Sequence, residues 1–143
     1  MAAVGLTPRV RIMAICDRVR ESKIETGVFH LKGVRQAMTA DVFPFVPARL
    51  WLFVVLSSPR AGEFPGYVRV VDDDNDRVVF HGHLTPPPVF GPDGGLWVIG
   101  YPVRCRFPKE GNYSAQVCFF QEQGSDILKG ELPFAVVMEG IDS

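Results

Sequence analysis

The sequence lacks any long hydrophobic run, because its longest uninterrupted apolar stretch covers only residues 50–56. A membrane-spanning helix needs about 20 apolar residues, so we expect no such helix and no membrane partner. The sequence also lacks an excess of charge of one sign, since its net charge is −1. A chain this close to neutral has no general attraction for phosphate backbones, and we expect no nucleic-acid partner.

The sequence contains only three cysteines, an odd number: Cys16, Cys105 and Cys118. Each lies in an apolar stretch, where a thiol packs as a small hydrophobic side chain; a Cys105–Cys118 bridge is the minor alternative. Residues 1–8 lack the charged start, apolar stretch and cleavage site of a signal peptide. Together these absences predict a cytoplasmic protein.

Familiar catalytic motifs are absent as well. The sequence has no Gly-x-Ser-x-Gly elbow, no glycine-rich loop that would cradle a phosphate, and no Cys–His arrangement at the spacing of a known family. Active sites also assemble from distant residues, but nothing in the sequence indicates one. We therefore predict a non-catalytic protein without a cofactor.

Short alternating segments, separated by fourteen glycines and twelve prolines, make up most of the sequence. They predict about eight strands, at residues 10–17, 27–34, 49–57, 66–72, 77–84, 95–107, 113–121 and 129–137. In the first strand we expect Val10, Ile12, Ala14 and Cys16 to point inward, with a helix as the alternative. Strands at this spacing without helical crossovers predict one all-β antiparallel sandwich over residues 9–138, between tails at 1–8 and 139–143.

The segment 107–119 carries the clearest single signal. A proline and a glycine mark a corner, and one face of the following strand is formed by Tyr113, Ala115, Val117 and Phe119. A Gly-x-Tyr start of this kind is typical of the corner that turns the chain between the two sheets of an immunoglobulin-like fold. We therefore predict an immunoglobulin-like sandwich of about seven to nine strands.

Four short motifs are spread over most of the chain. They are Met-Ala-Ile-Cys-Asp-Arg at 13–18, Leu-Lys-Gly-Val at 31–34, Phe43-Pro44, and the corner Phe-Pro-Lys-Glu-Gly-Asn-Tyr at 107–113. Together they resemble one bacterial family of small cytoplasmic proteins of uncharacterised function. The resemblance covers about residues 10–137 and implies the same sandwich, with no catalytic residues to carry over. The sequence departs from the family in its Pro-rich loop at 85–94.

An acidic run at 72–76 is the first candidate for a metal site. Asp72, Asp74 and Asp76 match the opening of a calcium-binding EF-hand loop. The rest of the loop fails, because Arg77 stands where the glycine belongs and His83 where the bidentate glutamate belongs. Since Asp and Asn also favour tight turns, a polar turn between two strands is the simpler interpretation.

His81 and His83 are the second candidate, because alternate residues share one face of a strand. A third ligand is missing unless His30 supplies it, so two solvent-facing histidines are the simpler interpretation. We predict no metal. A small-ligand or metal-binding protein, with a site around these histidines and the 72–76 turn, remains the alternative function.

Two of the expected strands are apolar on both faces, at 50–56 and 96–103. A sandwich strand normally has one wet face, so a second face must be covered, either by loop 85–94 or by a protein partner or second copy. Aromatic residues are enriched in interface cores. We therefore predict a protein-interaction or self-assembly module with anchors at Trp51, Phe53, Phe90, Trp97 and Tyr101.

Overall fold

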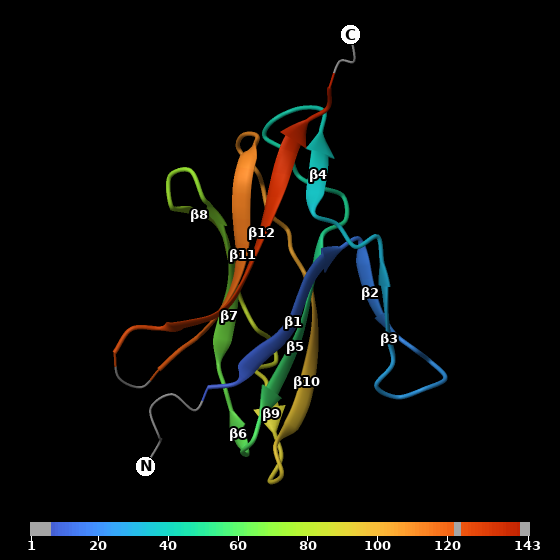
Figure 1. Cartoon of the computed structure of the whole chain (residues 1–143), viewed down its shortest axis with the longest axis vertical. Helices are drawn as coiled ribbons and strands as arrows, with labels where there is room; N and C mark the ends of the chain where they lie inside the picture. The colour runs from blue at the N-terminus through green and yellow to red at the C-terminus, as the bar shows by residue number, and fades with distance from the viewer. Residues whose placement is uncertain (1–6, 122–123, 141–143) are drawn as a thin grey trace.

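The computed structural model describes residues 7–121 and 124–140 and shows two β-sheets packed face to face (Figure 1). The three-stranded sheet has the order β1 (Arg9–Cys16), β5 (Trp51–Ser58), β10 (Gly95–Pro102). The five-stranded sheet has the order β4 (Ala37–Ala40), β12 (Ile127–Met138), β11 (Gly111–Phe119), β7 (Gly66–Asp72), β8 (Arg77–His83). The predicted all-β sandwich is confirmed, and helices are absent from the described residues.

Most strand pairs are antiparallel, but β4 and β12 are parallel. Two small ribbons lie outside the main sheets: β2 (Arg18–Glu21) with β3 (Phe29–Lys32), and β6 (Gly62–Glu63) with β9 (Val89–Phe90). No helix among the described residues is long and apolar enough to cross a membrane. Of the tails expected at 1–8 and 139–143, residues 1–6 and 141–143 lie outside the described part of the chain.

The predicted corner is present at the start of β11. The Tyr113 hydroxyl donates a hydrogen bond to the backbone carbonyl of Lys109, four residues upstream. The Tyr113 ring packs edge-on against Phe107, with ring centroids 4.9 Å apart. The face that the alternation predicted is buried in the core, at Tyr113, Ala115, Val117 and Phe119. A hydrogen bond from a tyrosine near the start of a strand back to the preceding corner is the arrangement known from immunoglobulin-like sandwiches.

The prediction for the first strand holds at Val10, which packs against the core, but is wrong for Ile12, Ala14 and Cys16. The register between β1 and β5 shifts between Val10 and Ile12, which leaves an extra residue in β1. Such a bulge moves every later side chain to the other face. As a result Met13 and Ile15 pack in the core, while Ile12, Ala14 and Cys16 lie on the outer face. The helical alternative is excluded, because the whole segment is extended.

Candidate functional site

The outer face of the three-stranded sheet carries Trp51, Phe53 and Val55 of β5, and the β2–β3 ribbon lies against it (Figure 1). The Phe29 ring of β3 lies 6.2 Å from the Phe53 ring, centroid to centroid. Val19 of β2 lies so close to β10 that a Cβ built on Gly100 would be 2.9 Å from it. The chain's own ribbon at 18–32 therefore covers the part of this second apolar face around Phe53 and Gly100, while Ile12 and Leu96 on the same face remain exposed. Loop 85–94 lies elsewhere.

Loop 85–94 instead closes one end of the sandwich. Its strand β9 pairs with β6, and the Phe64 amide donates a 2.9 Å hydrogen bond to the carbonyl of Pro88. Phe90 is only 4% exposed, and its ring centroid lies 5.9 Å from that of Phe64. The structure therefore places Phe90 in the core of the molecule rather than on its surface.

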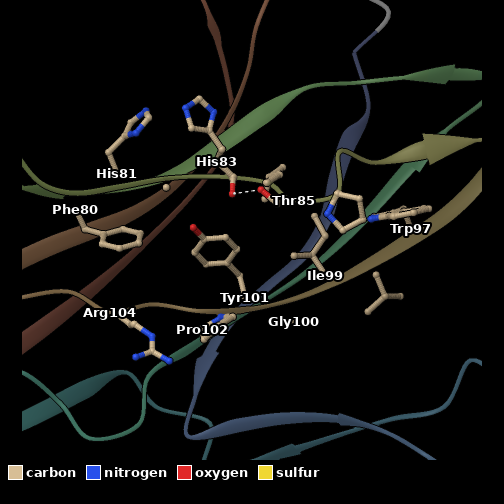
Figure 2. Close-up of a pocket in the computed structure, with 14 residues that line it drawn as sticks. Phe80, His81, His83, Thr85, Trp97, Ile99, Gly100, Tyr101, Pro102 and Arg104 are labelled. Atoms are coloured by element: carbon tan, nitrogen blue, oxygen red, sulfur yellow. Dashed lines mark hydrogen bonds between the residues drawn. The ribbon is translucent and has the colours of Figure 1, made fainter.

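The inner face of β10 lines an open groove. Trp97, Ile99 and Tyr101 stand opposite Leu56, Val54 and Leu52 of β5, all of which are core residues, so the three side chains point between the sheets. They are nevertheless only partly buried. Figure 2 shows Tyr101 projecting from β10 toward Phe80 of β8, and Trp97 lying beside the loop that begins at Thr85. The groove that these side chains line has a volume of about 600 Å³.

The opposite wall of the groove comes from β8 and the start of the following loop. Phe80 packs edge-on against Tyr101 with ring centroids 6.3 Å apart, and Leu84 and Pro86 complete the apolar lining. The Tyr101 hydroxyl lies against Gly82, where any larger residue would collide with it. Burial raises the pKa of the Tyr101 phenol, so the hydroxyl stays neutral and available as a hydrogen-bond donor.

One end of the groove is polar. Arg104 follows β10 and lies near Pro102 (Figure 2). It is the only Lys, Arg, Asp or Glu among the described residues that line the groove, and its side chain is exposed. At the other end, the Thr85 hydroxyl donates a 3.4 Å hydrogen bond to the backbone carbonyl of His83. The groove is thus mostly apolar, with a single fixed positive charge at one end.

The five predicted anchors do not form one surface. Trp51 and Phe53 lie on the outer face under the ribbon, Phe90 lies in the core, and Trp97 and Tyr101 line the groove. The sequence reasoning missed Phe80 and Arg104 as groove residues. The signal that could have found the groove is the Pro-Pro-Pro run at 86–88, which cannot form a regular strand beside β10.

The two histidines lie on the side of β8 opposite Phe80 (Figure 2). Their rings are 5.3 Å apart, His81 packs on Tyr67 at 4.6 Å, and His83 stacks on Phe120 at 5.8 Å, all between ring centroids. The cluster is therefore an aromatic patch on the outer face of the five-stranded sheet. No group of three metal-ligating residues occurs within 7–121 and 124–140.

The acidic turn lies toward the other end of the β7–β8 hairpin. Asp72 pairs with Arg77, whereas His81 pairs with Arg69, three residues or about 10 Å further along β7. The buried Asp72 carboxylate accepts a 3.0 Å hydrogen bond from the Asp74 amide. The structure therefore does not bring the acidic residues and the histidines together into one site.

A lysine forms ion pairs with two carboxylates of this turn. The Lys109 ammonium lies 3.4 Å from the Asp72 carboxylate and 3.1 Å from that of Asp74. Asp76 adopts a left-handed conformation with φ of 57°, as Asp commonly does in tight turns. This geometry fits a polar turn that is tied to the neighbouring corner.

Tyr67, which packs in the aromatic patch, should make the folded protein less stable at alkaline pH. Burial, and then its 3.0 Å hydrogen bond to Asp126, raise the pKa of the Tyr67 phenol from 10.0 to about 12. The neutral phenol is thus favoured by folding, so its stabilisation is complete below pH 10.0 and is lost between there and about 12. Above pH 10.0, urea unfolding should show the free energy of unfolding of wild type falling by about 1 kcal/mol per pH unit relative to that of Tyr67→Phe. Parallel pH profiles would contradict this assignment.

The comparisons with known proteins concern the fold. No protein-family model matches the chain, and no curated protein sequence matches it. The structure is similar to the C-terminal domain of wzt, with a TM-score of 0.52 and 9% identity over 93% of this chain and 75% of that chain. The soluble domain of PmoD from Methylocystis sp. ATCC 49242 (Rockwell) aligns at 11% identity and a TM-score of 0.36, over 90% and 96%. The first likeness shows the fold alone.

Proposed function

We propose that this protein is a non-catalytic protein-interaction module whose binding site is the groove between β8 and β10. The observation that carries the proposal is the partial exposure of Trp97, Ile99 and Tyr101 on the inner face of a sandwich strand. Side chains at such positions are normally covered by the opposite sheet. Trp and Tyr in a concave apolar site are the residue types that dominate binding energy at interfaces.

The polar groups of the groove favour recognition over catalysis. The Thr85 hydroxyl donates to a backbone carbonyl rather than to a base that could activate it. Arg104 presents a fork of donors that suits a carboxylate. Tyr101 offers a neutral hydroxyl beside an aromatic ring, which is a common contact in protein interfaces.

A bacterial, cytoplasmic setting belongs to the same proposal. It rests on the motif resemblance, carried by the 13–18 segment and the 107–113 corner. The three cysteines are consistent with it, because all of them are buried and unpaired. Burial raises the pKa of each thiol, so these residues stay protonated packing groups.

Trp97→Ala tests the proposal. Peptides selected from a displayed random library on the immobilised wild-type protein should bind the variant at least about 30-fold more weakly, the effect of losing a hot-spot residue worth about 2 kcal/mol. Fluorescence titration of a synthetic copy of an enriched peptide measures the affinity. Ile24→Ala is the matched control, since it removes an apolar side chain that is 94% exposed outside the groove.

The melting curve of each variant, recorded first, shows that both are folded at the titration temperature. A library that yields no peptide above the background of a blank surface would contradict the proposed function. So would peptides that bind wild type, Trp97→Ala and Ile24→Ala equally well.

A further inference from the structure

β10 is the unprotected edge of the sandwich. The two main sheets end in four strands, and three of these edges carry a feature that discourages pairing with another chain. β1 has a bulge and two arginines, β8 has a register irregularity opposite Val70 and Val71, and β4 is only four residues long. β10 spans eight residues with no charge, no register shift and no proline before its last residue, Pro102.

The free backbone groups of this edge follow from its pairing with β5. The Val103 amide donates a 2.8 Å hydrogen bond to the Leu50 carbonyl, in the same register as the rest of β10. In an antiparallel pair, alternate residues point their N–H and C=O groups toward the partner strand. Trp97, Ile99 and Tyr101 therefore bond to β5. The residues between them point their N–H and C=O groups to the open edge: Leu96, Val98 and Gly100.

The chain's own connection between β8 and β10 leaves this edge open. Pro86, Pro87 and Pro88 have no amide hydrogen, so this stretch cannot donate to a neighbouring strand. The next two residues form β9, which pairs with β6 instead. The position beside β10 is thus unfilled, and the groove lies under it.

Resting on the proposed function, we infer that the groove receives an extended peptide segment of another protein, which adds to β10 as a fourth strand of the three-stranded sheet. Its backbone would bond to Leu96, Val98 and Gly100, and its alternate side chains would enter the groove beside Trp97 and Tyr101. Strand addition of this kind derives its affinity from main-chain hydrogen bonds and its specificity from pockets for every second side chain. Cross-strand neighbours lie about 5 Å apart, close enough for the inward side chains of the segment to contact Trp97 and Tyr101.

Charge complementarity defines the chemistry of this segment. Arg104 lies at one end of the groove, forms no ion pair within the described part of the chain, and has no acidic neighbour among the lining residues. The segment therefore has apolar residues at alternate positions and a carboxylate at the end beside Arg104. The β10 strand of a second copy carries no acidic residue, so it does not complement this charge.

Val98→Pro separates strand addition from simple groove binding. The Val98 amide points to the open edge, so proline removes a donor without breaking a bond to β5, as edge strands tolerate. Val98→Ala is the matched control, because it removes side-chain packing but keeps the N–H. The probe is an acidic, alternately apolar peptide enriched from the random library. Its affinity should fall at least about tenfold for Val98→Pro and stay within about threefold for Val98→Ala.

The peptide supplies a second measurement that needs no variant. Methylation of its backbone nitrogens, one at a time, should abolish binding at every second position, where the N–H faces β10, and have little effect between these positions. If methylation weakens binding equally at every position, or at none, strand addition is overturned, and this test holds even if Val98→Pro does not fold. Arg104→Glu should lower the affinity for the acidic peptide at least tenfold. An unchanged affinity overturns the inferred carboxylate contact.

The outcomes distinguish the inference from the function on which it rests. If Trp97→Ala weakens binding but Val98→Pro does not, the groove binds peptides through side chains alone, and only strand addition is overturned. If neither variant has an effect, both fail. Sedimentation of the protein alone should give a monomer; a dimer that Val98→Pro dissociates would assign the edge to a second copy and overturn the peptide.

Discussion

Replacement of Phe107 by Ala should lower the free energy of unfolding by about 4 kcal/mol, the usual cost of removing a buried phenylalanine ring. Phe107 is 0% exposed. Its ring centroid lies 4.9 Å from that of Tyr113 and 5.9 Å from that of Phe134, both in edge-on geometry. The substitution would leave a cavity beside Tyr113. Tyr113 cannot easily move into it, because its hydroxyl is hydrogen-bonded to the Lys109 carbonyl.

Phe120→Ala is the matched control for this prediction. Phe120 is 41% exposed and packs on Tyr67 on the outer face, so its removal should cost about 1 kcal/mol. Urea unfolding followed by tryptophan fluorescence measures both values. Equal losses for the two variants would show that the Phe107 corner is not a centre of the core.

The parts of the fold that the sequence predicted are those with local causes. The alternation from Tyr113 to Phe119 needs only the two-residue period of a strand, and the corner before it needs only proline, glycine and tyrosine at fixed spacing. The acidic turn was also local, since Asp and Asn cap their own backbone. Such signals do not depend on which distant strand becomes the neighbour.

The orientation of β1 could not be predicted, because its cause is long-range. The alternation of apolar residues in this strand fits both faces, since Val10, Ile12, Met13 and Ile15 are all apolar. The bulge that decides between them exists only in the pairing with β5, more than thirty residues away in sequence. The face covered by the β2–β3 ribbon was equally hidden, because the contact between Phe29 and Phe53 depends on tertiary packing.

The sequence pointed to two residues of the candidate site but not to its other wall, its charge or its geometry. Trp97 and Tyr101 were correctly identified as large side chains on one face of one strand. The apolar residues on both sides of 50–56 and 96–103 indicated that a second face of these strands is covered. In the structure, however, the predicted anchors of the two strands lie on opposite faces of the sheet. The outer face is covered by the β2–β3 ribbon only around Phe53, while the inner face at Trp97 remains partly open because of the unfilled position beside β10.

Gly94→Ala should destabilise the protein by about 3 kcal/mol and disturb the groove from its far end. Gly94 has φ of 70°, a left-handed conformation that costs other residues about 1–2 kcal/mol. A Cβ there would also collide with the backbone of the 58–60 segment, including the Ser58 carbonyl and, at 2.7 Å, the Pro59 carbonyl carbon. Backbone cannot move aside as a flexible side chain does, so a further 1–3 kcal/mol of overpacking is expected, about the usual cost.

Gly91→Ala, in the same turn, separates this steric effect from a general effect of alanine. A Cβ on Gly91 meets nothing within 4 Å, and its carbonyl keeps the 2.9 Å hydrogen bond from the Gly94 amide. This variant should be within about 0.5 kcal/mol of wild type or slightly more stable. Because Gly94 immediately precedes β10, a shift there moves the strand that carries Trp97. Gly94→Ala should therefore lower both the free energy of unfolding in urea and the affinity for the enriched peptide, whereas Gly91→Ala should change neither. If Gly94→Ala binds the peptide as tightly as Gly91→Ala, this turn does not position the groove.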